Sequence, residues 1–459
     1  MHSLLKEKIR IASGQGFWGD LPKAPVDQIK NGEIDYLVMD YLAEVTMSIM
    51  QKQRMRNPEY GYARDFVEML DEMLPAIKSQ GIKVVSNAGG VNPLACKDAI
   101  LDAARKQDIK DIKIAVVDGD DILNDLENLI GQGHELSNME TGQPIKSVKD
   151  QLLSANVYFG ARPVVEALGN GADIVVTGRV TDTGLTLGPM IHEFGWEFSD
   201  YDKLAAGTIA GHIIECGGQA SGGNFTDWEK AGDLASIGFP IIEAFPDSTF
   251  HVTKHKKSGG LINEMTVKEQ LLYEIGDPSE YITPDVIADF TTVQLKEVDV
   301  DCVHVSGIKG YPETPTYKIS ASYNDGYKIS SSLVYCWPDA VKKALSAADI
   351  LKKRAELLGI NFESFRTEFV GVNACDENPD RLNEDLSDLN EVEMRVSARG
   401  KNRDELDRFG KEIAPLILTG PSGVTGFAGG RPKSSTIVAY WPALLDKKAC
   451  KPRVTLYQV

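Results

Sequence analysis

Two stretches of this chain gather side chains that can do chemistry. The first, residues 177–182, follows an apolar run and contains Arg179 and Asp182. An arginine at such a position can clamp a carboxylate or a phosphate, with Asp182 capping or orienting it. The alternative is an Arg179–Asp182 pair with a purely structural role.

The second stretch, residues 211–224, contains His212, Glu215 and Cys216. Residues 203–215 read as a helix, and spacings of three and four place these side chains on one face. Three hypotheses stay open: acid/base catalysis by His212 or Glu215 with Cys216 as a nucleophile, metal ligation, or a hydrogen-bonded helix end. The negative end of the helix raises a thiol pKa, which favours the acid/base role over a covalent one. Metal ligation is disfavoured because no second H-x-x-E or C-x-x-C pattern is present.

The glycine-rich run after this helix can present backbone N–H groups to one oxyanion. We expect Gly222 and Gly223 to supply amides that stabilise an enolate, and Gln219 and Asn224 to add side-chain donors. The alternative is a flexible connector.

The elements that must position these residues follow a β/α pattern. Short β-branched runs occur at residues 9–13, 36–39, 83–86, 113–117 and 173–177, and we predict them to be strands. They alternate with amphipathic helical stretches. This pattern predicts an α/β fold with an N-terminal, mainly parallel, Rossmann-like sheet flanked by helices. One helix is expected over residues 62–80, ended by Gly81, and another from Pro93.

Each predicted strand runs into small or polar residues. In open α/β sheets the ligand crevice lies at the carboxyl ends of the strands, so these turns predict one shared cleft. The residues assigned to substrate binding on this ground are Gly16, Asn87, Gly89, Gly90 and Asn92. Asp182, Asp40 and Glu44 are second-line carboxylates for catalysis. The Gly14-Gln15-Gly16 turn is a poor dinucleotide fingerprint, because Phe17 and Trp18 follow it and the next helix begins late.

The second half of the chain has a different pattern of predicted strands and helices. Short β-rich runs at residues 291–295, 303–305, 317–321 and 328–334 precede one long helix at 340–358. We therefore predict a Rossmann-like domain over residues 1–232 and an α+β domain over 233–459. The glycine-rich run 418–432, with Arg431, suggests an anion nest or a subunit contact, and the chain is expected to form a homo-oligomer.

The composition excludes some partners. The 459 residues carry a formal net charge of -18, which opposes sequence-independent nucleic-acid binding. No run of about 18 apolar residues predicts a membrane span, and the amino terminus has no secretory pattern, so we expect a cytoplasmic protein. The basic stretch 254–257 could meet the phosphates of CoA, or could be a solvated loop.

Several motifs, taken together and in order, resemble the AtuA family of acyclic terpene utilisation proteins. They are the two stretches above, residues 192–196, Asn87–Gly90, Gln270–Pro278, Thr283–Val286 and Gly429–Pro432. The resemblance implies terpenoid catabolism, because the family is named for gene clusters that degrade citronellol and geraniol as branched acyl-CoA esters. A lyase role on a 3-hydroxy-3-alkylglutaryl-CoA is assumed for it, and a small companion domain often accompanies it, here expected as a separate protein.

We therefore expect a lyase- or hydratase-type enzyme that acts on an acyl-CoA or carboxylic acid by proton transfer with enolate stabilisation. In that mechanism Arg179 and the glycine loops hold the anionic group, and His212 or Glu215 moves the proton. CoA would enter as part of the substrate, with no metal. The alternatives are a non-catalytic or incomplete subunit that needs its companion, and a metal-dependent lyase or hydrolase.

Overall fold

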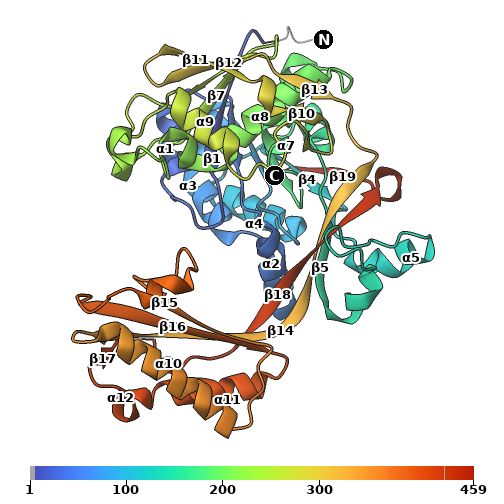
Figure 1. Ribbon diagram of the computed structural model, residues 1–459. Helices are drawn as coiled ribbons and strands as arrows, with labels where there is room; N and C mark the ends of the chain where they lie inside the picture. Colours follow the sequence, from blue (N-terminus) through green and yellow to red (C-terminus); the bar gives the residue numbers. More distant parts are fainter. Residues whose placement is uncertain (1–5, 428, 459) are drawn as a thin grey trace. The chain divides into compact units, whose positions relative to one another are not determined.

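The computed structural model describes residues 6–427 and 429–458 and divides into two compact units. Unit 1 is formed by Met1–Ser322 and Tyr440–Val459, and unit 2 by Tyr323–Ala439 (Figure 1). The chain is a mixed α/β protein with a large mixed sheet. Among the described residues no helix is both long and apolar enough to cross a membrane.

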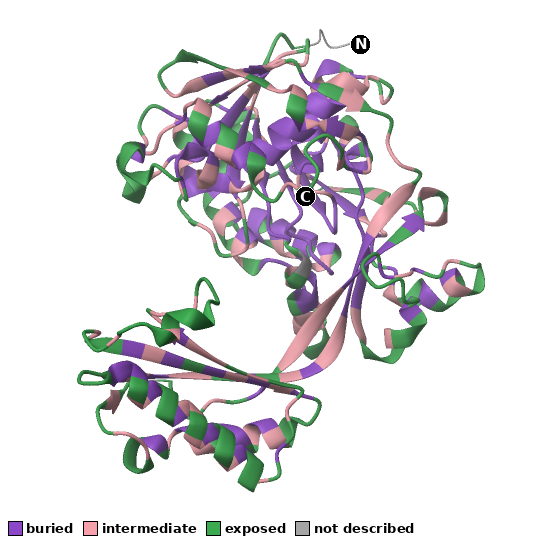
Figure 2. Cartoon of the chain, viewed as in Figure 1, coloured by how far each residue is buried: buried purple, intermediate pink, exposed green. Residues whose placement is uncertain are grey.

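Unit 1 is built around a ten-stranded sheet in the order β11-β12-β8-β7-β1-β2-β3-β6-β4-β19. Its central strands are mutually parallel. They are β1 (Ile9–Gln15), β2 (Tyr36–Met39), β3 (Lys83–Ser86), β6 (Ile174–Thr177) and β4 (Lys113–Asp118). All five strands predicted from β-branched runs are confirmed. Figure 2 shows that these strands are buried along most of their length.

The remaining strands of this sheet are antiparallel, so the sheet is mixed and the expected Rossmann-like parallel sheet is not confirmed. β7 (Ile241–Ala244) pairs with β1, β8 (Phe250–Thr253) with β7, and β12 (Cys302–Ser306) with β8. β11 (Gln294–Asp299) closes one edge and β19 (Arg453–Gln458) the other. The expected boundary at residues 232 and 233 thus falls inside unit 1, because later strands satisfy the free edge of β1.

Helices cover both faces of the parallel centre. On one face, alternate residues such as Leu37 and Met39 join the core formed with α1 (Ala24–Asn31), α3 (Arg64–Gln80) and α4 (Pro93–Lys106). On the other face, the Tyr36 hydroxyl donates to Glu193 of α7 (Gly184–Phe194), 2.6 Å away. α6 (Arg162–Gly169) and α8 (Tyr201–Glu215) pack beside α7.

The predicted helix boundaries are largely met. α3 ends at Gly81 in the left-handed conformation, with φ 70°, as the sequence predicts. α4 begins at Pro93, but the Asn92 side chain does not cap it. Asn92 instead donates to the carbonyls of Pro58 and Tyr60, 2.8 Å from each.

Several further elements complete unit 1, and some of them pack on α8. They include a small sheet of β9 (Tyr281–Ile282), β10 (Ile287–Asp289) and β13 (Lys309–Tyr311), of which β10 and β13 pack on α8. Also present are α2 (Glu44–Arg56), α5 (Leu126–Gly131), β5 (Leu152–Val157) and α9 (Glu264–Leu272). This arrangement brings residues from distant parts of the chain to the carboxyl end of α8.

Unit 2 is an antiparallel sheet with helices packed on it. β16 (Glu391–Gly400) lies between β15 (Ser364–Val370) and β14 (Thr316–Cys336), and β17 (Val424–Thr425) pairs with β14. β14 covers two predicted strands and also pairs with β5 and β18 (Ser435–Asp446). Alternate residues of β16 pack against α10 (Ala340–Leu357), α11 (Arg403–Ile413) and α12 (Leu416–Thr419).

Candidate functional site

A cavity of about 480 Å³ in unit 1 collects four of the side chains singled out in the sequence. They are Arg179, Asp182, His212 and Glu215. Arg179 and Asp182 lie between β6 and α7, and His212 and Glu215 lie in the last turns of α8. The structure thus brings the two predicted stretches to one site.

Arg179 is buried in the wall of this cavity; its Nη atoms are bonded, whereas its Nε has no hydrogen-bond partner among the described residues. Its side chain is 2% exposed, and its Nη1 donates to Asp182 Oδ1 at 2.8 Å and to the Leu42 carbonyl at 3.0 Å. The guanidinium carbon lies 4.0 Å from the centre of the Tyr158 ring. Burial opposes the charge, but the attraction of Asp182 and Tyr158 raises the pKa of Arg179 well above its usual value. Asp182 and Arg179 therefore hold one another in place.

A second buried layer supports Arg179. The Asn87 amide donates to Asp40 Oδ1 at 2.7 Å, and its own oxygen accepts from the Tyr41 N–H at 2.8 Å. Burial, together with the charge of Asp182, raises the pKa of Asp40 well above its usual value, despite the nearby Arg179. Asn87 thus positions the strand ends and does not line the cavity. The side chain of Glu44 lies outside the described residues.

His212 and Glu215 form a buried hydrogen-bonded pair. His212 Nδ1 lies 2.8 Å from Glu215 Oε1, and His212 Nε2 lies 3.0 Å from the carbonyl of Gln270 in α9. A carbonyl only accepts, so Nε2 carries a hydrogen and Nδ1 faces the carboxyl group. The Gln270 side-chain amide returns a bond to the His212 carbonyl at 2.9 Å. Both imidazole nitrogens are therefore occupied.

The surroundings of the pair raise the pKa of both its members. Burial disfavours the imidazolium, but the charge of Glu215 and the bonds to Glu215 and Gln270 raise the pKa of His212. Burial also raises the pKa of Glu215, against the opposing effect of His212. Glu215 Oε2 has no hydrogen-bond partner among the residues that the structure describes. One carboxyl oxygen of the pair is thus buried without a partner among these residues, whereas both imidazole nitrogens are engaged.

Two features of the cavity attract negative charge. Thr181, Asp182 and Thr183 line it where α7 begins, so the positive end of an eleven-residue helix lies beside it. Lys318 of β14 also lines it, with its ammonium 5.2 Å from the centre of the Tyr158 ring. Glu274 adds a further carboxylate to the wall.

The cavity also has an apolar part. Met139, Ile282 and Leu444 line it and are 56%, 58% and 47% exposed. Large apolar side chains that stay exposed around a polar cavity are typical of a binding site for an amphipathic ligand.

Cys216 and the glycine run do not line this cavity. Burial, together with the charge of Glu215, raises the pKa of Cys216 to about 12, which is the direction expected from its helix end. Gln219, Gly223 and Asn224 line a separate cavity of about 250 Å³ together with residues of α9. Gly222 adopts φ 96° at the end of a short 3₁₀ turn.

The other predicted glycines allow close backbone packing. A Cβ on Gly16 would lie 2.7 Å from the carbonyl carbon of Cys216, so the end of β1 touches the end of α8. Similar crowding occurs at Gly89 beside Pro93, and at Gly90, with φ 52°, beside Met50. Gly90 and Asn92 line a further cavity of about 250 Å³ near Asp118 and Arg453.

Several lining residues were missed from the sequence. Tyr158 and Lys318 stand among ordinary residues and come together through the pairing of β5 with β14. Gln270, Glu274 and Thr283 lie in segments that carried the family resemblance, which was a usable signal. Glu274 also has φ 57°, a strained backbone for a residue other than glycine.

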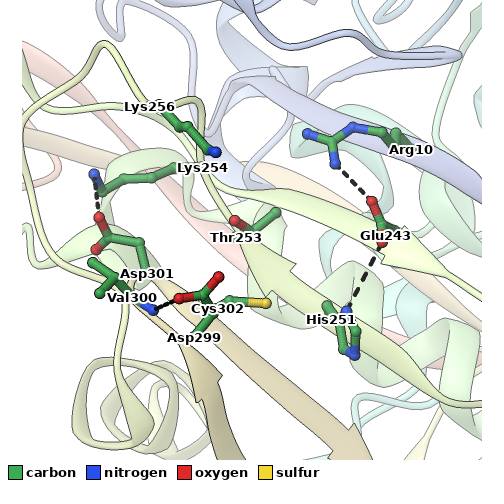
Figure 3. Close-up of a pocket in the computed structure, with 10 residues that line it drawn as sticks. All are labelled: Arg10, Glu243, His251, Thr253, Lys254, Lys256, Asp299, Val300, Asp301 and Cys302. Carbon is green, nitrogen blue, oxygen red and sulfur yellow. Dashed lines mark hydrogen bonds and ion pairs between the residues drawn. The ribbon is translucent and has the colours of Figure 1, made fainter.

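A different cavity, of about 430 Å³, lies on the antiparallel part of the sheet and contains the basic residues Lys254 and Lys256 (Figure 3). Lys254 is buried and pairs with Asp301 at 2.9 Å, and Arg10 pairs with Glu243 at 2.7 Å. Within the 254–257 stretch, Lys254 is thus neutralised by a neighbouring carboxylate. Among the described residues, no three His, Cys, Asp or Glu side chains are grouped to hold a metal ion.

Comparison with known proteins gives one match. The family model described as acyclic terpene utilisation family protein AtuA matches residues 9–456. No curated protein and no solved structure matches the chain.

Proposed function

The chain belongs to the acyclic terpene utilisation AtuA family, and on that premise we propose that it is a lyase or hydratase of terpenoid or branched acyl breakdown. Its reaction moves a proton on the carbon next to a carboxyl or thioester group. The observation that carries the proposal is the buried His212–Glu215 pair, in which Nδ1 and Oε1 lie 2.8 Å apart and Glu215 Oε2 has no partner among the described residues. A carboxyl group of raised pKa in a cavity is suited to general acid/base work.

Each lining group has a role in this reaction. Glu215 Oε2 takes or returns the proton, and His212, held by Gln270, positions the carboxyl group. The positive end of the α7 dipole and the Lys318 ammonium stabilise the oxygen of a developing enolate. Arg179, whose side chain is 2% exposed, holds Asp182 in place through Nη1. The alkyl chain lies against Met139, Ile282 and Leu444.

The test uses two CoA thioesters as probes. Exchange of the α-protons of 3-methylbutyryl-CoA in heavy water, followed by NMR, reports proton abstraction alone. Loss of water from 3-hydroxy-3-methylbutyryl-CoA, followed by enoyl absorbance, reports the whole elimination. Glu215→Gln should slow both by about 100-fold or more, in the range of general acid/base contributions.

Glu264→Gln is the matched control, because Glu264 lies on the surface of α9 in an ion pair with Lys268. It should leave both rates unchanged. The proposal fails if the wild-type protein catalyses neither reaction, or if Glu215→Gln is as fast as the wild type.

A second candidate function is that of a subunit whose site is completed by a small companion protein. The exposure of Met139, Ile282 and Leu444 favours it, since a partner could cover these side chains. Full turnover by the isolated chain, unchanged when the companion is added, would rule this candidate out.

A further inference from the structure

We infer that Tyr158 is a second proton-transfer residue of the Glu215 cavity, able to act because two cations lie against its ring; this inference rests on the proposed function. Tyr158 lines the cavity and is 6% exposed. Tyr158→Phe removes only the hydroxyl group, so it tests the proton-transfer role while leaving the packing of the ring in place.

Backbone hydrogen bonds fix Tyr158 between two segments. Its N–H donates to the carbonyl of Lys318 in β14 at 2.9 Å. The next residue, Phe159, donates to the carbonyl of Arg179 at 3.1 Å and accepts from Thr181 at 2.8 Å. The residues that supply the two cations are therefore the ones that hold the backbone at Tyr158.

The charges around the ring set its chemistry. The Arg179 guanidinium carbon lies 4.0 Å and the Lys318 ammonium 5.2 Å from the ring centre. A phenolate spreads negative charge into its ring, so cations near the ring stabilise it more than they stabilise the phenol. The other ionisable groups that line the cavity are Asp182, His212, Glu215, Glu274 and Tyr281. In the proposed step Tyr158 acts as a phenol that gives up its proton.

The reaction in which Tyr158 takes part is the elimination of water from a 3-hydroxyacyl thioester. Glu215 removes the proton next to the thioester, the electron pair of that C–H bond forms the C=C bond, and the C–O bond at the next carbon breaks. The Tyr158 hydroxyl gives its proton to the leaving oxygen, which departs as water. The proton on Glu215 then returns to the Tyr158 phenolate through solvent, which restores both groups.

The first test separates the two residues. Tyr158→Phe should keep the α-proton exchange of 3-methylbutyryl-CoA, which needs only Glu215, and should slow water loss from 3-hydroxy-3-methylbutyryl-CoA by about 100-fold. Tyr317→Phe is the control: Tyr317 also lies near a lysine ammonium, that of Lys447 at 5.6 Å, but does not line the cavity. Unchanged water loss, or an equal fall of both rates in Tyr158→Phe, overturns the inference. Failure of the proposed function appears differently, as the absence of both reactions in the wild type.

The second test needs no substrate. Ultraviolet difference titration of the wild type against Tyr158→Phe isolates the ionisation of this phenol. Lys318→Met should move that ionisation to higher pH, and Lys318→Arg, which keeps the charge, should restore it. An ionisation that stays in place in Lys318→Met overturns the electrostatic basis of the inference, whatever the protein turns over.

Discussion

At the residue scale, the site depends on a buried cation whose charge is balanced by one neighbour. Asp182→Asn leaves the Arg179 guanidinium buried without its carboxylate, 2.8 Å away in the wild type. Breaking such a pair by removing one partner is strongly destabilising, and we expect a loss of roughly 2 to 4 kcal/mol in the free energy of unfolding, measured by urea denaturation.

Asp227→Asn provides the matched comparison, since Asp227 pairs with Lys230 at the same sequence spacing but on the surface, at 2.5 Å. Its effect should stay within about 0.5 kcal/mol. Equal losses in the two variants would show that the Arg179 pair has no special role.

The residues found from the sequence and those missed differ in how they are brought together. Arg179, Asp182, His212 and Glu215 lie in two short stretches where reactive side chains are dense, so composition alone reveals them. Tyr158 and Lys318 become neighbours only through β5–β14 pairing. Neither lies in a stretch of the sequence that is dense in reactive side chains. The prediction that the glycines at 222 and 223 face the same site stays untested by any ligand, and they line no part of this cavity.

At the element scale, the end of β1 supports the turn of α8 that carries Glu215. Gly16→Ala would place a methyl group 2.7 Å from the Cys216 carbonyl carbon and 2.9 Å from the Glu215 carbonyl oxygen, where only backbone can yield. We expect a loss of about 1 to 3 kcal/mol and slower α-proton exchange. Gly169→Ala, at the end of α6 where nothing lies within 4 Å, should lack both effects.

Two strand and loop ends carry buried carboxyl groups that make stability depend on pH. Burial raises the pKa of Asp120, after β4, to about 6, and burial raises that of Asp285 to about 6 as well. The folded state holds these protons more tightly than the unfolded state. Each protonated carboxyl group therefore stabilises the folded state fully below about pH 4. This stabilisation is lost as the pH rises through about 6, which lowers the free energy of unfolding by roughly 3 kcal/mol per group.

Asp120→Asn should make the free energy of unfolding depend less steeply on pH. In the wild type Asp120 Oδ2 accepts from Arg179 N at 2.9 Å and from Asn156 Nδ2 at 2.8 Å, and the amide oxygen of the variant can still accept both bonds. Urea midpoints measured between about pH 4 and 7 test it, with Asp227→Asn as the exposed control. A slope as steep as that of the wild type would contradict the assignment.

The parallel strands were predictable because each is a short β-branched run that ends in a turn residue. Their partners were not, since the free edge of β1 is satisfied by β7, more than two hundred residues later. Local pattern defines a strand, whereas pairing across such a distance depends on which edges remain open after collapse. The division of the chain into Met1–Ser322 with Tyr440–Val459, and Tyr323–Ala439, depends on the same kind of long-range pairing.

At the scale of the whole molecule, each unit has a core of its own. Phe409 of unit 2 is 0% exposed and packs against Phe362 and Phe365, with ring centres 5.1 and 5.8 Å away. Phe409→Ala should destabilise unit 2 by about 3 to 5 kcal/mol, seen as faster hydrogen exchange across residues 323–439. Leu418→Ala, at a side chain 90% exposed, should change little.

Unit 2 interrupts unit 1 in the chain, and this has a consequence for synthesis on the ribosome. Leu444, which lines the cavity, and β19, which closes one sheet edge, are translated after all of unit 2. Domains tend to fold as their residues emerge, so residues 323–439 can reach their structure while the larger sheet still has an open edge at β4. The cavity is thus the last part of the protein to be completed, and the nascent chain must keep β4 from pairing elsewhere until β19 arrives.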